Sequence, residues 1–119
     1  MDEERRKAVR IKTSLFVQYC FNINSEHKSW DITTVKDLSE TGVSLQTGMP
    51  FEIGTIIALC FKIPSRPFDK TEINAVVVGC QSIGQGTTCI VRAEFKNVSD
   101  DTRGVLREYV LWMVKNQGL

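Results

Sequence analysis

Residues 71–95 read TEINAVVVGCQSIGQGTTCIVRAEF, and this stretch decides which class of fold the rest of the chain can form. Residues 71–81 and 87–95 are rich in β-branched and other apolar side chains, which favour strands. The connection between them, Ile83-Gly84-Gln85-Gly86, carries two glycines, as hairpin connections often do. The stretch therefore predicts two antiparallel strands joined by a hairpin.

Four further runs of strand-like composition precede this hairpin, covering residues 15–21, 30–36, 43–46 and 55–63. Leu15, Val17, Tyr19 and Phe21 of the first run would line one face, at the period of a strand. The polar residues 22–29 predict that the first two runs form a hairpin, and Pro64 and Pro67 stop the fourth. Six short strands separated by turn signals favour an antiparallel barrel or sandwich over a parallel sheet.

The C-terminal residues 99–117 have the pattern of a helix. Ser99 is a suitable N-cap, and Asp100 and Asp101 suit the positive end of the helix dipole. Apolar residues at helical spacing would pack on one end of the strands: Leu106, Tyr109, Val110 and Met113. Others widen this surface enough to contact another chain as well, such as a second copy in a homodimer: Val105, Leu111, Trp112 and Val114. The sequence thus predicts an all-β domain with a C-terminal helix that Gly118 could terminate.

Size and charge exclude several classes of protein. The chain has 119 residues, 42% hydrophobic and 24% charged, as expected of one globular domain with one core. A net charge of +1 gives no overall basic field, so we expect no general DNA or RNA binding. No apolar run approaches the roughly 20 residues that cross a bilayer. The N-terminus lacks the apolar region of a secretory signal, so we expect a cytoplasmic domain without a membrane span.

Reactive side chains form no recognisable catalytic or metal site. Cys20, Cys60, Cys80 and Cys89 each lie inside a strand-like run, which favours buried free thiols over disulfides. No two cysteines have the spacing of a zinc knuckle, and His27, the only histidine, lies in a polar turn. Because no nucleophile or phosphate-loop motif is present either, we expect no enzyme activity, no metal and no cofactor.

Two arginines stand four residues apart just before the first strand, in Arg5-Arg6-Lys7-Ala8-Val9-Arg10. A guanidinium can pair bidentately with a phosphate or with the O6 and N7 acceptors of guanine, and its flat face can stack on a base. The spacing alone also fits solvent-exposed arginines that bind no ligand. Arg103 and Arg107 have the same spacing in the expected helix, where exposure to solvent is enough to explain them. Residues 1–10 are polar and terminal, so we expect a flexible basic arm.

A second motif, Asp37-Leu38-Ser39-Glu40-Thr41-Gly42, lies where one strand must turn into the next. Turn chemistry alone can explain it, because aspartate and serine bond their own backbone in turns and glycine accepts positive φ. Ligand binding can also explain it. A carboxylate can accept from guanine N1 and N2 hydrogens, a hydroxyl can bond a base or a phosphate, and glycine allows close approach.

Together, Arg6-x-x-x-Arg10 and Asp37-x-Ser39-x-x-Gly42 resemble the signature of the PilZ domain family in both order and separation. This resemblance implies a bacterial six-stranded antiparallel β-barrel, residues 11–97, closed by a C-terminal helix. It also implies a receptor that binds cyclic di-GMP, changes conformation and signals to a protein effector. Matching residues would form the ligand site: Arg6 and Arg10 clasping guanine and phosphate, Arg5 extending the clasp, and Asp37, Ser39 and Gly42 opposite.

The resemblance also has implications for stoichiometry and has local exceptions. In PilZ-like domains an arginine at the place of Arg5 suits two intercalated cyclic di-GMP molecules, so we expect two per chain.

An arginine that commonly follows the paired valines of the family is replaced by Gly79. A glycine that often precedes the last strand's apolar-x-Phe segment is replaced by Arg92. These exceptions leave ligand contacts from the far strands open.

Two alternative functions fit the same layout. Small β-barrels also bind single-stranded nucleic acid through aromatic platforms and basic grooves, although the near-neutral charge disfavours this. A structural adaptor with a degenerate motif is the other alternative, but all five signature positions are present. A cyclic di-GMP receptor is therefore the leading hypothesis.

Overall fold

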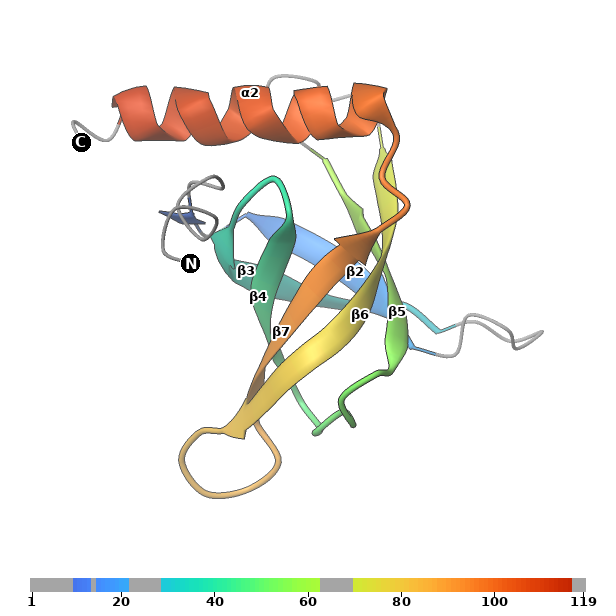
Figure 1. Cartoon of the computed structure of the whole chain (residues 1–119). Coiled ribbons are helices and arrows are strands. Elements are labelled where there is room, and N and C mark those ends of the chain that lie inside the picture. Colours follow the sequence, from blue (N-terminus) through green and yellow to red (C-terminus); the bar gives the residue numbers. More distant parts are fainter. Residues whose placement is uncertain (1–9, 14, 22–28, 63–69, 117–119) are drawn as a thin grey trace, which may run out of the picture.

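A computed structural model describes residues 10–13, 15–21, 29–62 and 70–116. Within these ranges the chain forms seven strands and one helix (Figure 1). The strands are β1 (Ile11–Lys12), β2 (Phe16–Cys20), β3 (Asp31–Leu38), β4 (Gly42–Thr47), β5 (Ile56–Phe61), β6 (Thr71–Ser82) and β7 (Cys89–Lys96), and the helix is α2 (Asp100–Asn116).

Six of the strands close into an antiparallel barrel. They pair in the order β3-β2-β5-β6-β7-β4, and a further pairing of β4 with β3 completes the ring. The barrel and the two predicted hairpins, β2–β3 and β6–β7, are confirmed. The two-residue strand β1 adds to the end of β3, where Ile11 is opposite Leu38. The segment that follows Arg10 is thereby fixed to the barrel wall.

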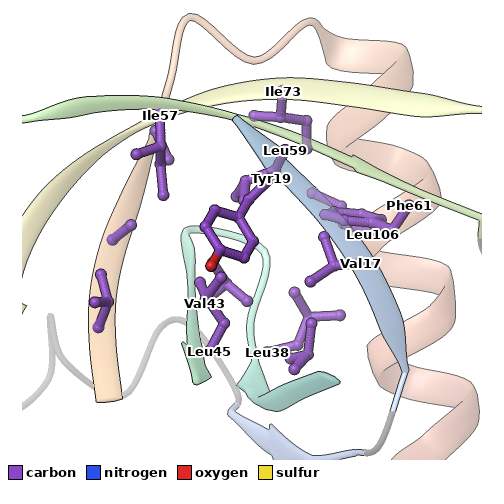
Figure 2. Close-up of a cluster of buried hydrophobic side chains, with 14 of the residues drawn as sticks. Val17, Tyr19, Leu38, Val43, Leu45, Ile57, Leu59, Phe61, Ile73 and Leu106 are labelled. Atoms are coloured by element: carbon purple, nitrogen blue, oxygen red, sulfur yellow. The ribbon is translucent and has the colours of Figure 1, made fainter. Parts of the chain in front are cut away.

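The core fills the barrel with inward side chains from all six ring strands (Figure 2). Val17, Leu45 and Leu59 are almost fully buried. Alternate residues of each strand face inward because successive side chains point to opposite faces. Tyr19 and Phe51 meet edge to face with ring centroids 6.3 Å apart. The predicted period-two face of the first run ends early, since Phe21 is 40% exposed.

Helix α2 lies across one end of the barrel, away from the β6–β7 connection (Figure 1). Its first turn is capped as predicted, because the Thr102 amide donates to Ser99 Oγ at 3.1 Å. Leu106, Tyr109 and Val110 are buried against the barrel. Leu111 and Trp112 are each 55% exposed, so part of the helix's apolar surface faces solvent. This one described helix is not long and apolar enough to cross a membrane.

Several details differ from the sequence-based expectations. All four cysteines are free, but Cys80 is exposed, because it lies near the end of the β6–β7 hairpin. The second predicted strand does not end at Lys36, and β3 continues to Leu38. Arg107 is not simply solvated, because its Nε donates to Glu40 Oε2 at 2.9 Å. His27, Gly118 and residues 1–9 of the predicted arm lie outside the described residues.

Candidate functional site

A row of mainly polar residues crosses five neighbouring strands. Its members are paired directly, strand by strand: Lys12 with Asp37, Asp37 with Ser44, Ser44 with Arg92, and Arg92 with Gly79. Directly paired residues project to the same face of a sheet. Neighbours along the strands, such as Leu38 and Val91, are buried in the core, so this polar row lies on the outside of the barrel.

Two irregularities in strand pairing aim the row outward. Val35 pairs with Leu45 but Asp37 pairs with Ser44, so Lys36 is an extra residue on β3. A second extra residue, Val78, precedes Gly79 on β6. An extra residue reverses the alternation of a strand and re-aims the side chain that follows. The first bulge therefore turns Asp37 to the outer face and Leu38 into the core.

Asp37 is the polar centre of this outer face. One of its carboxylate oxygens lies 3.6 Å from Arg10 Nε and accepts a hydrogen bond from Ser44 Oγ at 3.2 Å. The Asp37 side chain is 25% exposed, whereas that of Arg10 is 60% exposed. The carboxylate is thus held by the barrel, and a mostly solvated guanidinium lies beside it. Such a pair offers an acceptor and a planar donor at one place.

The β3–β4 turn next to Asp37 is organised by Ser39, which is buried. Its hydroxyl oxygen accepts from the amides of Thr41 and Gly42, both at 3.2 Å, and its own amide donates to the Gly42 carbonyl at 2.9 Å. Gly42 itself lies close to β7, because a methyl group on it would come 2.6 Å from the Ala93 carbonyl oxygen. Both residues have structural roles in the turn.

Two contacts join this region to helix α2. The hydrogen bond from Arg107 holds the pKa of Glu40 below its usual range, and the same pairing raises the pKa of Arg107. Thr13 Oγ1, just after β1, shares a hydrogen bond with the hydroxyl of Tyr109 at 3.1 Å. The end of β1 and the β3–β4 turn, which both adjoin Asp37, therefore contact the helix directly. Figure 1 shows the β3–β4 turn pointing toward the helix.

The predicted site residues fall into three groups. Arg10 and Asp37 are brought together on the outer face, while Ser39 lies in the adjoining turn and Gly42 begins β4 directly after it. Arg5 and Arg6 lie outside the described residues. The motifs did not point to Ser44, although a serine between Val43 and Leu45 occupies an outward position in an alternating strand. Within the described ranges, no three His, Cys, Asp or Glu side chains gather as metal ligands do.

A family model described as "PilZ domain" matches residues 4–112. This chain belongs to the PilZ domain family. The match covers the basic N-terminal motif, the barrel and most of α2. It therefore includes every residue that the sequence assigned to the candidate ligand site.

Solved PilZ proteins share the fold. The inhibitor of motility MotI from Bacillus subtilis is 21% identical with a TM-score of 0.77, over 94% of this chain and 52% of that one. MrkH from K. pneumonia, in complex with c-di-GMP, is 16% identical with a TM-score of 0.71, over 96% and 54%. The PilZ domain of YcgR from Escherichia coli, with c-di-GMP, is 19% identical with a TM-score of 0.69, over 96% and 94%.

The extent of these similarities differs between the neighbours. The chain spans about half the length of MotI and MrkH but nearly all of the YcgR PilZ domain. No curated protein sequence matches it. At such identities the likeness establishes the fold of this PilZ domain and leaves its ligand to be argued from the polar row.

Proposed function

We propose that this PilZ domain is a non-catalytic receptor for cyclic di-GMP, acting in the cytoplasm, and that the nucleotide binds across the Arg10–Asp37 end of the polar row. The observation that carries the proposal is the placement of Arg10 beside Asp37 on the outside of the barrel. These residues come from the two halves of the family signature, which are separated by 27 positions in the sequence (37 − 10). Two solved neighbours, MrkH and YcgR, hold c-di-GMP in their structures.

The chemistry of the pair fits a guanine nucleotide. The Asp37 carboxylate can accept from the N1 and N2 hydrogens of guanine, and the Arg10 guanidinium can bind a phosphate or stack on a base. Arg6 and Arg5 would add guanidinium groups to this clasp. Ser39 and Gly42 would form the adjoining wall, where Ser39 would contribute through the turn it organises and Gly42 through close backbone approach.

Helix α2 is the proposed output of the receptor. It contacts the segment after Arg10 through Thr13–Tyr109 and the β3–β4 turn through Glu40–Arg107. A nucleotide that pulls on Arg10 or on the turn would change these contacts and so the position of the helix. Trp112, exposed and stacked on Tyr109 with ring centroids 6.5 Å apart, would then present a different surface to a protein partner.

The test is a calorimetric titration with cyclic di-GMP. Arg6→Ala, Arg10→Ala and Asp37→Ala should each weaken binding about tenfold or more, because a charged hydrogen bond contributes roughly 1.5–3 kcal/mol. The exposed helical variant Arg103→Ala should bind like the wild type. Unchanged affinity in all three site variants would refute the site, and tighter binding of random oligonucleotides at matched salt would favour a nucleic-acid-binding barrel instead.

The same titration measures stoichiometry. We expect two cyclic di-GMP molecules per chain, because two stacked nucleotides bring four phosphates and four guanines, and Arg5 adds a third guanidinium to serve them. Arg5→Leu should reduce the ratio to one. A wild-type ratio of one that the substitution leaves unaltered would mean that Arg5 has no such role and only forms solvent-exposed ion pairs.

A further inference from the structure

The far end of the polar row holds a second exposed guanidinium. Arg92 projects outward from the middle of β7, next to Ser44 on one side and Gly79 on the other. It takes part in neither of the ion pairs described above, Arg10–Asp37 and Arg107–Glu40. Its cationic group therefore lies on the same face as Asp37 without joining the contacts that hold the turn and the helix.

Gly79 makes room for this arginine. A methyl group placed on Gly79 would lie 3.4 Å from Nε and 3.8 Å from Cζ of Arg92, so the guanidinium group rests over the glycine. The backbone at Gly79 does not have a positive φ, unlike that at Gly84 or Gly86, so no turn requires a glycine here. The missing side chain instead gives the Arg92 guanidinium a defined position on the β6–β7 surface.

The two exceptions to the family pattern thus meet at one cross-strand pair. Gly79 stands where an arginine is common and Arg92 where a glycine is common, and the structure pairs these two residues directly. In an antiparallel pair, side chains from either partner reach the same patch of surface. A guanidinium at either position would therefore lie on the same part of the barrel wall.

We propose that Arg92 is a second ligand-contacting residue, which binds a phosphate or the O6 and N7 acceptors of a guanine at the far end of the polar row. The inference rests on the proposed cyclic di-GMP function. Asp37 and Arg92 are two strands apart, which is about 10 Å. Cyclic di-GMP carries two guanines and two phosphates, so a ligand held at Arg10 and Asp37 presents further acceptors along the row.

The experiment compares Arg92 with a matched cation by calorimetric titration of cyclic di-GMP. Arg92→Ala should weaken binding about tenfold. Lys96→Ala removes a positive charge from the same exposed face of the same strand, four residues along, and should change affinity less than about twofold at physiological salt, because screening acts over roughly 8 Å. Arg92→Lys should recover only part of the affinity, because lysine lacks the planar fork.

Exchanging the pair gives a second, independent readout. Arg92→Gly should lose affinity like Arg92→Ala, and adding Gly79→Arg to it should restore binding to within about threefold of the wild type, because the guanidinium returns to the same patch. Far-UV circular dichroism and thermal unfolding would verify that each variant is folded.

The outcomes separate this inference from the proposed function. If the wild type binds and Arg10→Ala weakens binding, but Arg92→Ala matches Lys96→Ala, then Arg92 has no ligand role and the receptor function stands. If the exchanged pair fails to restore affinity in a folded protein, the proposed equivalence of the two positions is wrong. If the wild type does not bind cyclic di-GMP at all, both proposals fall together.

Discussion

Among the described residues, the β3–β4 turn and the β6–β7 turn reverse the chain in different ways. The β3–β4 turn, Ser39–Glu40–Thr41, contains a buried serine, packs Gly42 against the β7 backbone and bonds to α2 through Glu40. The β6–β7 turn at the other end carries Gly84 and Gly86 at positive φ, and nothing lies within 4 Å of a methyl group placed on either. One turn is part of the packed structure, and the other only reverses the chain.

Turn-like composition therefore does not reveal whether a turn is packed against the rest of the structure. Glycine and hydroxyl residues occur in or beside both turns, so composition alone does not distinguish them. In the β3–β4 turn the same residues also fix the end of β3, where Asp37 holds Arg10, and the contact with α2. Its rigidity is therefore tied to the candidate ligand site, whereas the β6–β7 turn can vary without reaching it.

Glycine substitutions should separate the two turns most strongly. Gly42→Ala places a methyl group 2.6 Å from the Ala93 carbonyl oxygen, and because this atom is backbone, β4 or β7 must shift. We expect a loss of about 3 kcal/mol in the free energy of unfolding, measured in urea. Gly84→Ala, with a φ of 64° but open space around it, should cost only about 1 kcal/mol. Equal losses would contradict the distinction between the turns.

Serine substitutions test the same comparison through hydrogen bonds. Ser39→Ala removes the acceptor of two backbone amides, one of them the buried Gly42 amide, and should cost about 1–3 kcal/mol of unfolding free energy. Ser82→Ala, at the β6 end of the other hairpin, removes only a weak 3.9 Å contact with Cys89 and should stay within about 0.5 kcal/mol. If Ser39→Ala left stability unchanged but weakened nucleotide binding, the hydroxyl would serve the ligand and not the turn.

The architecture could be predicted from the sequence because the six strands of the ring and the helix each carry a local signal, whereas the two-residue strand β1 carries none. The hairpin in residues 71–95, the Ser99 cap and the buried face of α2 are all local patterns. The bulges at Lys36 and Val78 are not, because the extra residue is defined only by its pairing with another strand. The first bulge interrupts the alternation of β3 after Val35, which is why the sequence pattern predicts a strand that ends at Lys36 when β3 continues to Leu38.

The candidate site was predictable only where it coincides with a motif. Arg10 and Asp37 belong to the signature, and the structure brings them to 3.6 Å. Ser44 and Arg92 join them through cross-strand register, which depends on the whole ring of strands and is invisible in the sequence. Likewise, the sequence predicts that Arg107 is a solvated helical residue, because its partner Glu40 is 67 positions away and no local pattern links the two.

The smallest expected effect concerns the ion pair that ties the β3–β4 turn to the helix. The Arg107 hydrogen bond lowers the pKa of Glu40 in the folded protein, so the pair contributes stability above the ordinary carboxylate pKa and loses it as the pH falls through the lowered value. Glu40→Gln should therefore lower the thermal midpoint by about 1–3 °C at neutral pH and leave it unchanged in acid, where Glu40 is protonated. Arg107→Gln should produce the same loss, and the double variant should lose no more than either single one.

The matched control is Glu52→Gln, which removes an exposed carboxylate in a loop and should show no such pH-dependent difference in thermal midpoint. A loss in Glu40→Gln that persists in acid would mean that the turn depends on the shape of the side chain and not on its charge, and the β3–β4 turn would then be joined to α2 by packing alone.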